Sequence, residues 1–86
     1  MEFQGALIRE QGVTFAIVIV KPHVLQGDDQ ARAAISSFQP LFPGAPIVLM
    51  AQNHRGIPTY YGRKDLVRFL SRVPMGSIPW KQYRTN

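Results

Sequence analysis

Cysteine is absent from the 86 residues of the chain. Its absence excludes disulfide bonds, thiol catalysis and zinc sites built on thiolates, and it leaves His23, His54 and the carboxylates as the available metal ligands. Long apolar runs are absent too, because the longest is far too short to span a bilayer and no signal peptide precedes it. We therefore expect a soluble, cytoplasmic protein with no membrane partner, no metal site and no cofactor.

Glycine-rich phosphate-binding patterns are also lacking. The chain contains neither GxGxxG nor GxxxxGK. Asp28 and Asp29 stand at the predicted start of a helix, where they occupy the positive potential that would otherwise attract an anion. No phosphate site is expected at that helix.

Acidic residues are scarce in the second half of the chain. Residues 44–86 hold seven Lys and Arg against a single acid, Asp65, for a net charge of +6, whereas residues 1–43 hold three bases against four acids, for a net charge of −1. An asymmetry of this kind suggests an anionic partner. Small basic proteins without such a partner are also common, so the charge alone does not show whether this protein has an anionic partner.

The most informative stretch that is present is Val13–Val20, which has the sequence VTFAIVIV. Seven of its eight residues are apolar and it has no helical period, which predicts a strand buried on both faces at the centre of a sheet. A shorter strand is expected over residues 5–9. The Gln11-Gly12 spacer predicts a hairpin, so this strand would pair antiparallel with the central one and lie at an edge.

A helix and a second buried strand follow. An N-cap aspartate in Gly27-Asp28-Asp29 is expected to begin the helix, and Pro40 ends it near Gln39. Residues 47–51, IVLMA, form the next apolar run. A strand, a helix and a strand make a βαβ unit, so the two buried strands are predicted to be parallel.

The second half continues with a short returning strand over residues 57–61, placed at an edge by Pro58. Residues 63–73 are predicted to form a second helix. The whole chain, 1–86, is thus expected to be one small two-layer α/β (α+β) domain in the order β-β-α-β-β-α. It would have a mixed four-stranded sheet, both helices on one face and an irregular C-terminal tail over residues 74–86.

The tail interleaves aromatic and cationic residues in Trp80-Lys81-Gln82-Tyr83-Arg84. Such a pattern can stack the bases of a single strand, but these rings can equally pack on the domain or on a second subunit. Because the core of so short a chain is small and aromatic residues are enriched in interfaces, we predict a homodimer with Trp80 or Tyr83 at or near its interface.

Two groups of residues are candidate sites. The first is the edge where parallel strands end, a common place for ligands in open α/β sheets. There we expect Lys21 and His23 to meet His54 and Arg55, a set suited to acid–base chemistry or to holding an anion. Ordinary solvated loop residues are the alternative.

The second group is a basic stripe on the second predicted helix. Lys64, Arg68 and Arg72 recur every four residues and so share one face, and Arg63 precedes them. Like charges at this spacing repel, so a purely structural helix gains nothing from the arrangement. Contact with phosphate or with an acidic protein is one interpretation, and a solvated helix face is the other.

Two short resemblances bear on these sites. The run from Thr14-Phe15-Ala16-Ile17 to Val20-Lys21-Pro22 resembles the first strand of nucleoside diphosphate kinases, which ends in Lys-Pro-Asp, but this chain has His23 in place of the aspartate. The segment that carries that family's phosphorylated histidine has no counterpart here, so the resemblance does not imply the activity. Arg55-Gly56-Ile57-Pro58-Thr59 is similar to the distal half of thioredoxin-like domains, in which the proline is cis, without their cysteines.

The sequence thus favours a small non-enzymatic binding or adaptor module whose basic half contacts nucleic acid or an acidic protein. One alternative is a ligand-binding or enzymatic domain that uses the edge at His23 and His54. Another is a dimeric structural protein with no dedicated anionic partner.

Overall fold

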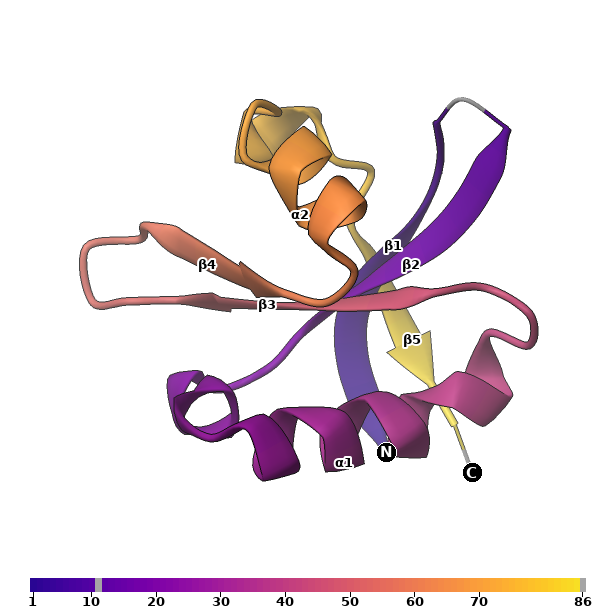
Figure 1. Ribbon diagram of the computed structural model, residues 1–86, viewed down its shortest axis with the longest axis horizontal. Helices are drawn as coiled ribbons and strands as arrows, with labels where there is room; N and C mark the ends of the chain where they lie inside the picture. Colours follow the sequence, from indigo (N-terminus) through magenta and orange to yellow (C-terminus); the bar gives the residue numbers. More distant parts are fainter. Residues whose placement is uncertain (11, 86) are drawn as a thin grey trace.

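The computed structural model describes residues 1–10 and 12–85, so Gln11 of the expected turn lies outside the described residues. Its centre is a five-stranded sheet in the order β4-β3-β2-β1-β5, with α1 and α2 on either side (Figure 1). The strands are β1 (Glu2–Glu10), β2 (Val13–Ile19), β3 (Ile47–Gln52), β4 (Pro58–Tyr61) and β5 (Lys81–Arg84), and the helices are α1 (Asp28–Phe38) and α2 (Lys64–Leu70). Three short 3₁₀ turns are η1 (Pro22–Gln26), η2 (Gln39–Leu41) and η3 (Met75–Ser77).

The predicted βαβ unit is confirmed. β2 and β3 are parallel, with partners running from Ala16↔Ile47 to Ile19↔Met50, and α1 lies between them in the chain. β1 pairs antiparallel with β2, as the hairpin prediction required. β4 returns antiparallel along β3 and lies at the end of the sheet, where its Pro58 is tolerated.

The helices cover opposite faces of the sheet, so the prediction that both lie on one face is wrong (Figure 1). Successive residues of a strand point to opposite faces. In β2, Phe15 and Ile17 enter the core under α2, whereas Ala16 and Val18 enter the core under α1. A strand that is apolar on both faces needs cover on both, and one helix supplies each.

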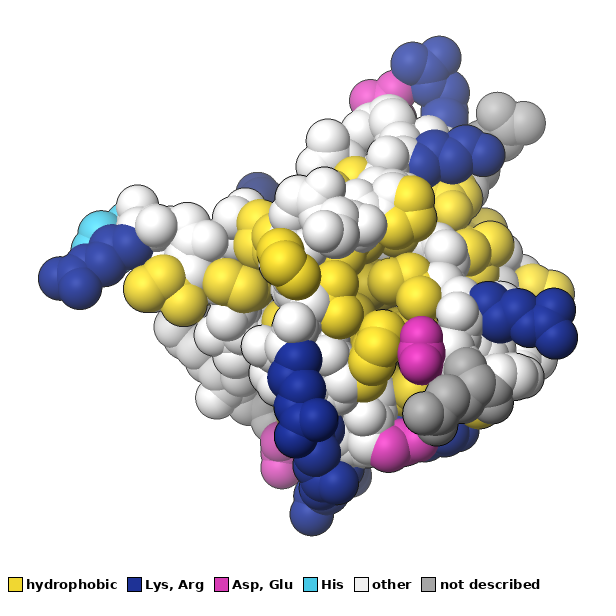
Figure 2. All heavy atoms as spheres, turned by 90° about the horizontal axis from the view of Figure 1, so that it is seen from above, with side chains coloured by type: hydrophobic (Ala, Val, Ile, Leu, Met, Phe, Trp, Pro, Cys, Tyr) yellow, Lys and Arg dark blue, Asp and Glu magenta, His cyan; other side chains and the backbone are white. Residues whose placement is uncertain are grey.

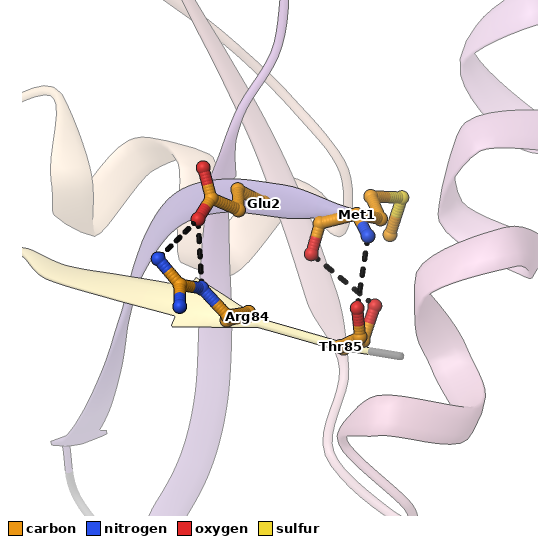
Figure 3. A network of polar contacts seen from close by, with 4 residues as sticks. All are labelled: Met1, Glu2, Arg84 and Thr85. Atoms are coloured by element: carbon orange, nitrogen blue, oxygen red, sulfur yellow. Dashed lines mark hydrogen bonds and ion pairs between the residues drawn. The ribbon is translucent and has the colours of Figure 1, made fainter.

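The segment predicted as an irregular tail contains a fifth strand. β5 pairs antiparallel with β1, from Gly5↔Lys81 to Glu2↔Arg84. At the end of this ladder the Met1 amino group donates to the Thr85 carbonyl at 2.9 Å and the Thr85 N–H donates to the Met1 carbonyl at 2.8 Å (Figure 3). The sheet therefore has five strands instead of four, and β1 is an inner strand instead of an edge.

The aromatic residues of this segment pack against their own chain. The Tyr83 ring stacks on Phe3 with centroids 5.1 Å apart and meets Phe42 edge-on. The Trp80 ring packs on the core under α2, and its Nε1 donates to the Met75 carbonyl at 3.1 Å. Packing within the domain thus accounts for both rings, and the homodimer stays a prediction.

The helix ends differ in detail from the sequence interpretation. α1 has Gly27 as its N-cap, and Asp28 and Asp29 lie in its first turn instead of capping it with a side chain. α2 ends at Leu70, before the expected end near Val73. The peptide bond before Pro58 is trans. None of the helices in the described part of the chain reaches the length and apolarity that crossing a bilayer requires.

Candidate functional site

The three cations of the basic stripe are exposed. Lys64 and Arg68 lie on α2 and Arg72 lies just after it. Among residues 1–10 and 12–85, none of these three side chains forms an ion pair or a hydrogen bond. Their charges are therefore open to a partner from outside the chain.

Arg63, the fourth cation of this group, is already paired. Its Nε lies 2.7 Å from Asp65 Oδ1, and its Nη2 donates to Oδ2 at 2.8 Å. The guanidinium lowers the pKa of the Asp65 carboxyl to about 2, and the same hydrogen bond raises the pKa of Arg63. Because Asp65 is the only acid in residues 44–86, this pairing leaves the other cations of the stripe without an acidic neighbour on their own helix.

Two of the open cations share a concave surface. A cavity of about 320 Å³ lies between α2 and the β1–β2 hairpin, and Arg68 and Arg72 both line it. Glu10 lines the opposite side, on β1. Asp65 lines it as well, so two carboxylates share this surface with the two guanidinium groups. Guanidinium groups bind carboxylates and phosphates through two parallel hydrogen bonds, so the part formed by Arg68 and Arg72 is the part suited to an anionic group.

A second hollow, which we call the β4–α2 groove, runs between β4 and α2. It consists of two adjoining cavities of about 510 and 370 Å³ that share Tyr60 and Ser71. The larger has an apolar wall that includes Ile57 and Val73, and the smaller is bordered by Lys64 and Arg68. Seen from the α2 side, apolar side chains gather in the middle of the face and Lys and Arg side chains lie around its rim (Figure 2).

Tyr60 is the unusual residue of this groove. Its hydroxyl is buried and has no hydrogen-bond partner within the described part of the chain. Burial raises the pKa of this phenol. An unsatisfied buried hydroxyl is unfavourable by about 1–3 kcal/mol, and a hydrogen-bond acceptor that reached it would recover part of this free energy.

The predicted strand-end site is only half assembled. Lys21 and His23 line a cavity of about 620 Å³, together with Glu2 from the N-terminal strand. His54 and Arg55 do not line it. They lie in the β3–β4 turn, where the Asn53 side chain accepts hydrogen bonds from the backbone N–H of Arg55 at 2.8 Å and of Ile57 at 3.0 Å.

The structure adds site residues that the sequence interpretation missed. Tyr60 lies in β4, a strand that the sequence did predict and whose edge position Pro58 correctly indicated, and Ile57 immediately precedes this strand. Nothing in the sequence pattern pointed to the groove, because α2 has to be placed over β4 before the groove exists. Glu2 lines the strand-end cavity because β1 lies beside β2. The sequence did predict that pairing, but the predicted strand began only at residue 5.

Neither a metal centre nor a known relative adds to this picture. Within residues 1–10 and 12–85, no group of three or more His, Asp or Glu side chains is placed to hold a metal ion. No protein-family model, curated protein or solved structure matches the chain. Geometry and charge therefore carry the functional inference.

Proposed function

We propose that the protein is a small non-enzymatic binding module that contacts an anionic partner, a nucleic acid or an acidic protein, through Lys64, Arg68 and Arg72. The observation that carries the proposal is that these three exposed cations have no anionic partner among the described residues, while the nearby acid Asp65 is held by Arg63. Arg68 and Arg72 also border a concave surface.

The energetics of the helix support this proposal. Like charges four residues apart destabilise a helix by about 0.2–0.5 kcal/mol per pair. Lys64 adds a cation at the positive end of the helix dipole, which is also unfavourable. A bound polyanion offsets both the repulsion between the cations and the unfavourable interaction of Lys64 with the helix dipole. A helix face that contacts only water offers no such compensation.

The proposal is tested by the salt dependence of polyanion binding. If three phosphates are neutralised, the slope of log affinity against log salt concentration is expected to be roughly −2 to −3, because each contact releases condensed counterions. Replacing Lys64, Arg68 and Arg72 together by Gln should weaken binding to single-stranded DNA and to polyglutamate, and it should flatten the slope. Fluorescence anisotropy over a series of salt concentrations measures both.

A matched control removes the same charge elsewhere. Arg9, Arg32 and Lys81 are exposed and lie on other elements, so replacing these three by Gln lowers the net charge equally. The control protein should keep most of the affinity. The proposal fails if the wild-type protein binds neither polyanion at low salt, or if the two triple variants bind equally.

A second candidate function, a small-ligand or catalytic site, is favoured by the cavity at the end of β2. It lies at the carboxyl end of a parallel strand, and Lys21 and His23 line it. NMR spectra of the histidine side chains during titration with small carboxylates, phosphates and nucleosides would test it. A ligand in the cavity should shift the His23 imidazole and leave His54 unchanged as an internal control. If none of these compounds shifts the His23 signals selectively, the cavity does not bind these classes of ligand.

A further inference from the structure

β4 has one open side. Among residues 1–10 and 12–85 it pairs only with β3, from Leu49↔Tyr61 to Gln52↔Pro58, and beyond this ladder the Asn53 N–H donates to the Ile57 carbonyl at 3.0 Å. Hydrogen-bonded and non-hydrogen-bonded pairs alternate along an antiparallel ladder. Counting from Asn53–Ile57, Thr59 and Tyr61 bond to β3, and Tyr60 directs its N–H and C=O to the open edge.

The two edges of the sheet differ in charge. The outer strand at the other end, β5, carries Lys81 and Arg84, and charged edge residues oppose the addition of another strand. β4 has the sequence PTYY, without a charge. Its proline stands at the first position and lacks an N–H, so the groups that β4 presents to the open edge are the Pro58 carbonyl and the N–H and carbonyl of Tyr60. The charge pattern therefore favours β4 over β5 as the edge that accepts a further strand, through the outward groups of Pro58 and Tyr60.

The β4–α2 groove lies beside this open edge. Its cavities are lined by residues of β4, α2 and the segments next to them, and by none of the described residues of β3. It therefore opens away from the neighbouring strand. Because side chains alternate along a strand, every second side chain of a strand added to β4 would point into the groove.

Charge determines what kind of strand fits. Lys64 and Arg68 border one end of the groove, and the apolar end contains Ile57, a residue that is 54% exposed. On the opposite face of β4, the Tyr61 hydroxyl donates to Asp28 at 3.3 Å, so an acid already lies there. The groove thus favours a segment with acidic and apolar side chains on its α2 side. A second copy of this chain would bring the same cations to the edge and would be repelled.

Tyr60 takes part in both the open edge of β4 and the β4–α2 groove. Its backbone N–H and C=O face the open edge, and its side chain lines both cavities of the groove. Its buried hydroxyl has no partner among residues 1–10 and 12–85. A strand laid along β4 would pair with the backbone of Tyr60 and cover its side chain in the groove.

From these features we infer that an extended acidic segment of a partner protein adds to the sheet as a strand along β4, with its acidic side chains at Lys64 and Arg68 and an apolar side chain beside Ile57. The inference rests on the proposed function and chooses the acidic protein over the nucleic acid as the partner. Backbone pairing supplies affinity and the groove supplies specificity, as in other complexes formed by strand addition.

The test uses a displayed library of short random peptides selected against the whole protein. Selected peptides should be acidic, with acidic and apolar residues at every second position. Their affinity should fall about tenfold more in Tyr60→Pro than in Tyr60→Ala, because both variants lose the ring and only proline loses the outward N–H. No enrichment of acidic peptides, or equal affinity for the two variants, would overturn the inference.

Amide hydrogen exchange on the wild-type protein gives a readout that does not depend on how the proline variant folds. A selected peptide should slow exchange of the Tyr60 amide at least about tenfold, whereas the Thr59 and Tyr61 amides, already bonded to β3, should change little. If the Lys64, Arg68 and Arg72 triple variant loses polyanion binding but the Tyr60 amide is never protected, strand addition is excluded and the proposed function stands. If the triple variant binds like the wild type, the proposed function itself falls.

Discussion

Replacing Ile17 by Asp is expected to remove at least about 4 kcal/mol of folding stability. Ile17 lies in the central strand with 0% of its surface exposed, in the core under α2. The substitution deletes buried apolar contacts and places a carboxylate where no charge is available to pair with it. Because small domains are stable by only about 5–15 kcal/mol, this loss is a large share of the total, and the urea midpoint should fall markedly.

Urea unfolding followed by circular dichroism measures this effect, and Thr14→Asp in the same strand is the control. Thr14 is exposed and lies opposite Arg9, so its replacement by Asp should change the free energy of unfolding by less than about 0.5 kcal/mol. A folded Ile17→Asp protein with a near-normal unfolding midpoint would contradict the description of β2 as the buried centre of the sheet.

Replacing Gly5 by Ala should destabilise the protein by about 2–3 kcal/mol. In a strand this change is usually favourable, because alanine restricts the unfolded chain more than glycine does. Here an added Cβ would lie 2.6 Å from the backbone carbonyl oxygen of Ile17. Contacts this short to a Cβ atom are essentially never found in proteins. The adjacent strand would have to shift, and strain of this kind is typical of overpacked sites.

Gly76→Ala provides the control for this prediction. Gly76 has no atom within 4 Å of an added Cβ, so the same substitution should be neutral or slightly stabilising. The opposite signs at the two glycines can be measured in parallel urea titrations. Equal stability of the two variants would show that β1 does not approach β2 at Gly5 as the structure has it.

The candidate site was predictable only where it depends on local spacing. A four-residue interval places Lys64 and Arg68 on one side of α2 whatever that helix packs against, whereas Arg72 lies beyond the end of the helix. The strand-end site depended instead on the geometry of two loops. His23 remained beside β2 in η1, whereas the Asn53 hydrogen bonds shape the turn that holds His54, so the two histidines were not brought into one cavity.

For the fold, local pattern was sufficient to predict the two parallel strands, α1, the hairpin and the edge position of β4. The apolar runs of β2 and β3 even required cover on both faces, because alternate side chains need a core on each side. Which helix covers which face, and the pairing of β5 with β1, were decided only by the tertiary structure. The Phe3–Tyr83 stack joins residues 80 positions apart, and no local period reports a contact at that distance along the chain.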